Sequence, residues 1–219
     1  MRPLRLLPLL VLLAACDAGT TRALYADDEI DYFVEVALGS EFGGGSAAVR
    51  RWGRDVRIAV RGAPTEADRQ TLEAVVADAN ALVGPVRLVL VDESPTVTVH
   101  FLPPDEFAAV EPNYVPGNLG FFWTWWSGGC EITRARILIS TEDVTQAERS
   151  HLIREELTQS LGLMRDSDRY PESVFYAPWT DVTEYAPIDR VLVEMLYRPE
   201  IEPCMGAAEA RRALEAITE

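Results

Sequence analysis

The chain has 219 residues, with 35 acidic and 20 basic side chains and a formal net charge of −15. An electric field of this sign repels phosphate backbones, which excludes nucleic acid as a partner. The length suits one well-packed core with at most two small lobes, and no apolar stretch after the N-terminal one is long enough to cross a bilayer.

The N-terminus has the features of an export signal. Arg2 and Arg5 precede an apolar run from Leu6 to Ala15, which is shorter than the roughly 20 residues that a membrane-spanning helix needs. Small residues then precede Cys16, and this pattern resembles the lipobox of bacterial lipoprotein precursors. The resemblance implies a signal peptide over residues 1–15, lipidation of Cys16 and a periplasm-facing location in the cell envelope. The lipid would make the membrane a partner, and the choice between inner and outer membrane stays open, as does an ordinary signal peptide with an incidental cysteine.

After a small and polar tether over residues 16–29, residues 30–219 are predicted to form one domain. Alternating segments rich in β-branched residues predict strands, and apolar residues at intervals of three and four predict helices. The predicted strands are 56–60, 87–91, 96–102 and 132–140, and the predicted helices are 30–38, 65–82, 145–161, 187–196 and 207–217. A flexible break is expected at Gly43–Ser46. Because helices dominate only in the later part, the predicted class is α+β, with an upper lobe over about residues 50–163 and a mainly helical lower lobe over about 164–219.

The cysteines suggest one disulfide. If Cys16 carries the lipid, Cys130 and Cys204 remain as a possible pair in an oxidising compartment. Closing a loop of that length stabilises a fold by roughly 4 kcal/mol in the chain-entropy model. Two separate buried thiols are the alternative.

The segment 154–166 carries the strongest functional signal. Its spacing resembles the zinc-binding helix of metzincin-type metallopeptidases, where two histidines one turn apart bind Zn²⁺, a glutamate polarises water and a glycine turn brings in a third ligand. On that frame Glu155 and Gln159 occupy the histidine positions, Glu156 the general-base position and Arg165 the third-ligand position. The spacing is kept while the zinc ligands are not.

Further segments extend this resemblance. Ser173–Tyr176 resembles the Met-turn of metzincins, with Phe175 at the position of the methionine, and Asp189–Tyr197 resembles the helix that follows in matrixin-type enzymes. Together these features resemble the domain of unknown function 2927 family, a bacterial secreted family whose members carry a Glu-Glu-Leu-x-Gln motif. The resemblance covers about residues 30–215. It implies a zincin-like, two-lobed domain with a mixed sheet, an active-site-type helix and a degenerate zinc motif.

With the zinc ligands replaced, we predict that Glu155, Gln159 and Arg165 satisfy one another as a carboxylate, an amide and a guanidinium. Asp166 and Phe175 are expected in the same remnant cleft, and neither a metal nor another cofactor is expected. The alternative metal pair is His151 with Glu155, which lie one helical turn apart.

Four aromatic residues are candidates for ligand binding, because they precede the strand expected to border the cleft. They are Tyr114, Trp123, Trp125 and Trp126. They would hold a peptide, a protein or a glycan, unless they belong to the core. The favoured function is therefore a non-catalytic binding or scaffolding protein of the cell envelope. The alternative is a hydrolase centred on Glu156, either an atypical peptidase or a carboxylate-dependent enzyme with Asp166 or Asp168 as the second acid.

Overall fold

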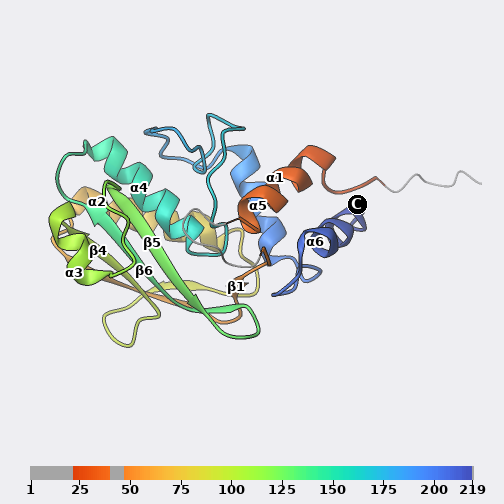
Figure 1. Cartoon of the computed structure of the whole chain (residues 1–219), viewed down its shortest axis with the longest axis horizontal. Helices are drawn as coiled ribbons and strands as arrows, with labels where there is room; N and C mark the ends of the chain where they lie inside the picture. Colours follow the sequence, from red (N-terminus) through yellow and green to blue (C-terminus); the bar gives the residue numbers. More distant parts are fainter. Residues whose placement is uncertain (1–21, 40–46, 219) are drawn as a thin grey trace, which may run out of the picture.

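The computed structural model describes residues 22–39 and 47–218. The expected signal peptide, Cys16 and the break at Gly43–Ser46 lie outside these residues. The described chain forms two lobes, one built on a sheet and one made of helices (Figure 1). Within the described ranges, none of the helices combines the length and the apolar character needed to span a membrane.

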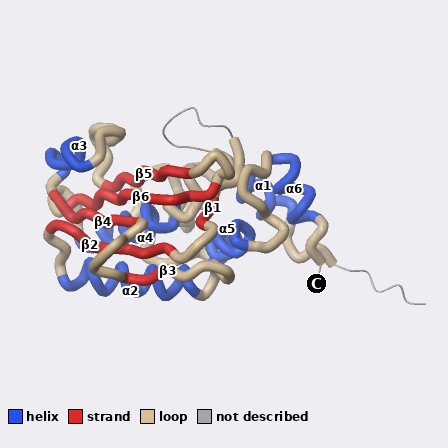
Figure 2. The backbone as a smooth tube through the Cα atoms, turned by 90° about the horizontal axis from the view of Figure 1, so that it is seen from below, coloured by secondary structure: helices blue, strands red, loops and turns tan. Residues whose placement is uncertain are grey.

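The first lobe is built on a six-stranded mixed sheet. Its strands are β1 (Arg51–Trp52), β2 (Val56–Gly62), β3 (Leu88–Leu90), β4 (Val97–Leu102), β5 (Gly120–Trp126) and β6 (Glu131–Ser140). The strands β6, β4, β2 and β3 are parallel neighbours, β1 pairs with the start of β6, and β5 runs antiparallel to β6. Figure 2 shows β5, β6, β4, β2 and β3 in succession, so β5 is an edge strand.

The helices α2 (Glu66–Asn80) and α4 (Gln146–Gln159) pack against each other on one face of this sheet, behind the strands in Figure 2. Each begins with a capping box: the Thr145 hydroxyl accepts the Glu148 backbone N–H, and the Glu148 carboxylate accepts the Thr145 N–H. Threonine followed three residues later by glutamate is the sequence pattern typical of this box. The short helices η1 (Pro104–Glu106) and α3 (Phe107–Val110) follow β4.

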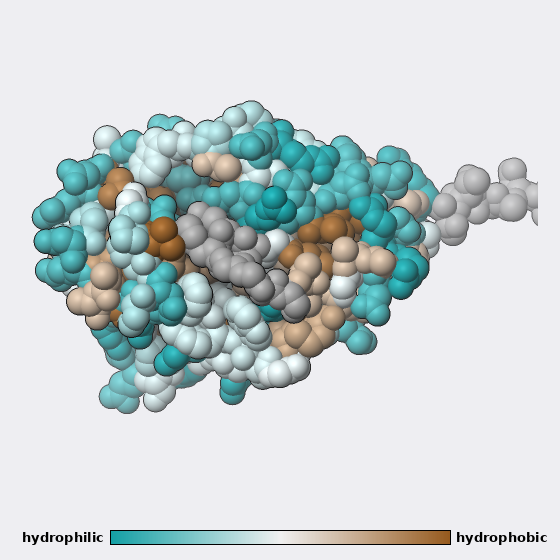
Figure 3. All heavy atoms as spheres, viewed as in Figure 1, coloured by the Kyte–Doolittle hydropathy of each residue, from teal (hydrophilic) through white to brown (hydrophobic). Residues whose placement is uncertain are grey.

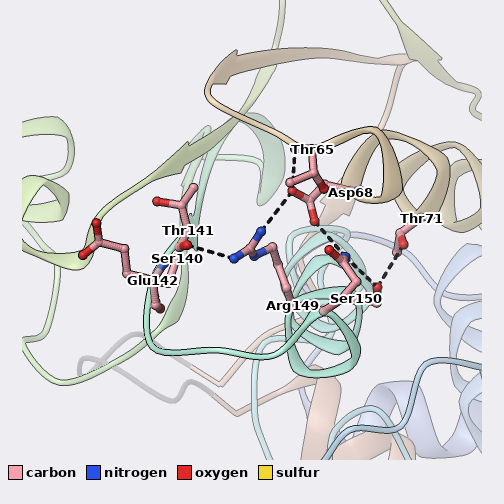
Figure 4. Close-up of polar contacts among 9 residues, drawn as sticks. Thr65, Asp68, Thr71, Ser140, Thr141, Glu142, Arg149 and Ser150 are labelled. Atoms are coloured by element: carbon pink, nitrogen blue, oxygen red, sulfur yellow. Dashed lines mark hydrogen bonds and ion pairs between the residues drawn. The ribbon is translucent and has the colours of Figure 1, made fainter.

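A buried polar network fixes the start of α4 to α2 (Figure 4). The carboxylate of Asp68 is fully buried and accepts hydrogen bonds from the Gln146 amide at 2.9 Å and from the Arg149 guanidinium at 3.4 Å. Arg149 also donates to the carbonyl of Thr141 at 2.9 Å. Each charged group therefore has an opposite charge or a hydrogen-bond partner, which is what a buried charge requires.

The helical lobe contains α1 (Asp27–Ala37), α5 (Pro187–Tyr197) and α6 (Ala207–Glu215). The apolar face of α1 is buried against α5 and α6, so this lobe takes a helix from before the sheet as well as the later part of the chain. An isolated bridge between Ala23 and Thr218 places the beginning of the described chain next to its end. The α+β class and the two-lobed arrangement predicted from the sequence are confirmed.

The structure contains the predicted disulfide between Cys130 and Cys204, with their Cα atoms 5.2 Å apart. Cys130 lies in the turn between β5 and β6, and Cys204 precedes α6. The bond therefore joins the sheet lobe to the helical lobe. The face seen in Figure 1 is mostly hydrophilic, as the strong net charge leads one to expect (Figure 3).

Candidate functional site

A cleft of about 440 Å³ lies beside α4. One face of α4 forms its floor, and its walls are the segment 117–120, which leads into β5, and the segment 176–180. The floor residues are His151, Leu152, Glu155, Glu156 and Gln159. They recur at intervals of three and four, and the helical period therefore brings them to one side of α4.

His151 and Glu155 form a pair on this floor. The His151 Nε2 lies 3.3 Å from the Glu155 carboxylate, and the His151 Nδ1 lies 2.7 Å from the carbonyl oxygen of Val182. Burial lowers the pKa of the imidazole, but the hydrogen bond and charge of Glu155 and the carbonyl of Val182 outweigh burial, so the pKa of His151 lies above its usual value. The pair therefore favours an imidazolium bonded to a carboxylate.

Gln159 forms the second pair of the floor, with Asp166. The Gln159 amide N–H donates to Asp166 Oδ1 at 2.5 Å, and the Gln159 side chain is almost fully buried. Both residues line the cleft. The amide that stands at a zinc-ligand position thus turns its donor toward a neighbouring carboxylate.

The predicted network of Glu155, Gln159 and Arg165 is wrong. Arg165 is exposed, its backbone N–H donates to the carbonyl of Val36 at 3.2 Å, and its side chain lies against Gly39, where an added Cβ would come within 2.1 Å of Arg165 Cδ. The chain leaves α4 through Gly162, whose φ is +126°, and then runs without helical structure. Asp166 contacts Gln159 of α4, whereas the side chain of Arg165 lies against Gly39, just after α1.

Glu156 lies at the contact between α4 and the edge strand. It is 6% exposed and lines the cleft. A Cβ added to Gly120, the first residue of β5, would lie 2.5 Å from Glu156 Oε1. The glycine therefore allows this close approach, and the catalytic role assigned to Glu156 stays a prediction.

Phe175 is buried in the core and is not among the described residues that line the cleft, which corrects its expected place there. Its ring is fully buried in the core, and its carbonyl accepts the backbone N–H of Ser167 at 2.9 Å. Nearby, Asp189 is fully buried and accepts the Ser173 hydroxyl and the Val174 backbone N–H. Burial raises the pKa of the Asp189 carboxyl to about 6, although these hydrogen bonds lower it.

The four candidate aromatic residues lie elsewhere, and none is among the described residues that line the cleft. Alternate residues of a strand point to opposite faces, so Trp123 and Trp125 lie on the face of the sheet away from α4. Tyr114 packs against Phe107, and Trp126 stacks with the Arg50 guanidinium, which lies 4.1 Å from the ring centroid. The aromatic side chains of the cleft are instead Tyr176 and Trp179, which the sequence did not indicate.

The segment 179–185 runs along α4 and is bonded to it at each turn; we call it the strap. From its outer to its inner end, the Trp179 indole N–H donates to Glu148 at 2.8 Å, Val182 contacts His151, and the Tyr185 and Thr158 hydroxyls lie 2.7 Å apart. Backbone and side-chain hydrogen bonds from Thr145, and that from Trp179, lower the pKa of Glu148. The sequence of the strap has no periodic pattern that would predict its position. The signal that could have indicated it is the row of polar residues on α4 to which it bonds.

The side chains at the metzincin frame positions do not fit a zinc site. Within residues 22–39 and 47–218, no three or more His, Cys, Asp or Glu side chains are grouped so that they could hold a metal ion. At the frame positions Glu155 pairs with His151 and Gln159 with Asp166. Tetrahedral zinc needs neutral imidazole, thiolate or carboxylate ligands that converge on one point.

An antiparallel edge strand, a helix that forms the cleft floor, a glycine turn after that helix and a buried turn beneath it together define a zincin-like domain. The chain belongs to the family described as "Protein of unknown function (DUF2927)", which matches residues 26–216. The family resemblance inferred from the sequence is therefore confirmed.

Two solved structures of myroilysin are similar in part. One is 9% identical to this chain with a TM-score of 0.44, and the matched region covers 68% of this chain and 82% of the myroilysin chain. The other is 10% identical with a TM-score of 0.46, and the matched region covers 81% of this chain and 99% of the myroilysin chain. No match is found among curated proteins.

Proposed function

We propose that this protein is a lipid-anchored protein of the cell envelope whose zincin-like cleft binds a ligand without cleaving it. The observation that carries the proposal is the pairing at the former ligand positions: Glu155 is bonded to His151 and Gln159 to Asp166. Side chains that satisfy one another in this way keep a polar cleft stable without a cation. The function that fits such a cleft is binding.

An extended peptide is the ligand that the cleft suits best. One wall leads into the edge strand β5, and in the described part of the chain β5 pairs with β6 alone. An unpaired strand edge offers backbone donors and acceptors to an extended peptide. The cleft is lined by five carboxyl residues, and no arginine is among the described lining residues, so a peptide with basic side chains is favoured. The five are Asp143, Glu148, Glu155, Glu156 and Asp166.

The anchor is supported by the lipobox-like sequence before Cys16. Ala23 pairs with Thr218 at the end of the helical lobe, away from the strands (Figure 1). A tether that enters there leaves the sheet lobe and the cleft free to reach a periplasmic ligand. Replacing Cys16 by Ser should release the protein into the soluble fraction, and retention in the membrane would contradict lipidation.

Metal analysis tests the loss of the zinc site. Protein purified without chelator should contain no stoichiometric zinc, whereas a Glu155→His/Gln159→His/Asp166→His variant should gain zinc if α4 keeps the geometry of the metallopeptidase frame. The matched control is Asp143→His/Glu148→His, which adds imidazoles to the cleft outside that frame. One zinc per wild-type chain would overturn the proposal.

A hydrolase centred on Glu156 is the second candidate. It is favoured by the position of Glu156, which is almost buried and yet lines the cleft beside β5. Replacing Glu156 by Gln keeps the size and removes the charge. An unchanged cellular phenotype supports binding, and loss of the phenotype with an unchanged melting temperature and unchanged peptide affinity supports catalysis.

A further inference from the structure

The face of the sheet that points away from α4 gathers positive charge on a protein that is strongly negative overall. The β-strand period brings Arg57 and Arg61 of β2 and Arg134 and Arg136 of β6 to this face, while their neighbours Ile58 and Ile137 point into the core. The register completes the surface, because Arg136 lies opposite Trp123 and Arg134 opposite Trp125. Figure 2 views the sheet with α2 and α4 behind it. We call Arg57, Arg61, Arg134, Arg136, Trp123 and Trp125 the basic sheet face.

Most of this charge is not neutralised by ion pairs. Arg57 donates to the backbone carbonyls of Glu93 and Ser94, each at 2.9 Å, and Arg61 donates to the carbonyl of Asp92 at 3.2 Å. Carbonyl oxygens orient a guanidinium but leave its charge in place. Among the four arginines of this face, Arg136 alone forms an ion pair with another described residue, Glu111, at 2.9 Å.

The ionisation of a neighbouring histidine reflects the same field. His100 of β4 lies opposite Arg61 on one side and opposite Leu138 on the other. Burial lowers the pKa of His100, and the charges of Arg136 and Arg61 lower it further. The acidic side chains of the adjoining loop, Asp92 and Glu93, are exposed and do not reverse this effect.

The two tryptophans give the face a second kind of contact. The Arg134 guanidinium lies 3.7 Å from the centroid of the Trp125 ring, and that of Arg136 lies 5.6 Å from it. Trp123 stacks with Phe121 at 6.4 Å and is half-buried. The rings are therefore held in place, and their partly exposed surfaces are available for stacking between fixed positive charges.

We propose that the basic sheet face binds an acidic polysaccharide. Guanidinium groups bind carboxylates in a bidentate manner, and tryptophan rings pack against the apolar faces of sugar rings. The surface therefore fits a polymer of sugar rings that carry carboxylates. Several separated arginines on an open sheet suit repeated anionic groups better than a single small anion. A bilayer fits less well, because the two tryptophans are held partly buried against the sheet and do not protrude for insertion.

The test measures binding of polygalacturonate by the full-length chain carrying Cys16→Ser, which keeps lipid out of the assay. At physiological ionic strength we expect saturable binding that weakens as salt is added. The neutral polysaccharide dextran should not bind, and poly-L-glutamate, which has the charge without sugar rings, should bind about tenfold more weakly.

The variant Arg57→Ser/Arg61→Ser should weaken binding of polygalacturonate by about tenfold or more, since two charge-assisted contacts are lost. Its matched control, Arg69→Ser/Arg212→Ser, removes two exposed arginines from α2 and α6 and should change the affinity less than about twofold. Because Arg57 and Arg61 also hold the loop at 92–94, Arg134→Ser is the second variant and should weaken binding several-fold with an unchanged melting temperature.

The proposal is overturned if polygalacturonate does not bind, if the two double variants lose affinity equally, or if poly-L-glutamate binds as tightly. Tighter binding to vesicles of phosphatidylglycerol and phosphatidylcholine than to polygalacturonate would assign the face to a membrane and also overturn it.

Discussion

The two flanks of α4 carry similar polar residues but bury them differently. On the flank toward α2, Arg149 and Arg154 form ion pairs with Asp68 and Asp78 at 3.4 and 2.8 Å. Both arginine side chains are almost fully buried, and Asp68 is completely so. This flank uses charge to attach one helix to another.

On the other flank, the pairs of the floor border an open cleft. His151 with Glu155, and Gln159 with Asp166, line a space of about 440 Å³ that connects to solvent. The type of a polar residue on α4 therefore does not tell whether it joins helices or borders the cleft, whereas the face of the helix on which it lies does. Substitutions should therefore lower stability more on the α2 flank than on the cleft flank.

The largest effect is expected for Asp68→Ala. The variant leaves the Arg149 guanidinium buried without its counter-charge and removes half of the Thr65 capping box, which together should cost about 3–5 kcal/mol of unfolding free energy. Urea denaturation measures it. Glu66→Ala, on the exposed side of α2, is the control and should cost less than about 0.5 kcal/mol. A small loss for Asp68→Ala would mean that the α2 flank is not structural.

The pH dependence of stability extends the comparison to Asp189, a third buried polar centre. Its pKa is about 6 in the folded state against 3.8 for the ordinary carboxyl. Because the folded-state pKa is raised, this contribution is fully present below pH 3.8 and is lost as the pH rises through about 6. The change should amount to about 3 kcal/mol. In Asp189→Asn this part of the pH profile should be absent; an identical profile in variant and wild type would contradict the assignment.

Gln159→Ala should cost about 2 kcal/mol, through lost packing and one lost hydrogen bond to Asp166. Thermal unfolding measures the cost, and Gln70→Ala, an exposed glutamine of α2, serves as the control. A cost as large as that of Asp68→Ala would show that the cleft floor supports the fold as much as the α2 flank does.

The smallest effect is expected for Glu155→Gln, about 1 kcal/mol or less. The raised pKa of His151 means that its contribution is present below the ordinary histidine pKa and is lost as the pH rises through the folded value. The variant should lower the pKa of His151, measured by NMR titration of its ring protons against His100 as an internal reference. An unchanged pKa would mean that Glu155 is not the partner.

The sequence predicts the helix of the cleft well and the edge strand poorly. The start of α4 follows from Thr145 and Glu148, and the spacing from Glu155 to Gly162 predicts its cleft-facing residues. In contrast, β5 has large apolar residues on both faces: Phe122 packs in the main core and Phe121 in a second cluster. Such a strand shows no alternation, so its period is hidden.

The register beyond Gly162 also could not be predicted. Counting three residues on from the glycine gives Arg165, but the direction of each side chain there depends on backbone angles that spacing does not fix. The strap escaped prediction for a related reason, because tertiary contacts rather than local propensity hold Trp179 and Val182 in place.

Attachment of the strap to α4 has a consequence for how selective the cleft is. One wall and the floor share a single helix as their support, from Glu148 at one end to Thr158 at the other. A displacement of α4 relative to the sheet would carry both together and would leave their separation unchanged. For the peptide proposed above, the distance between this wall and the floor would then be set before it binds.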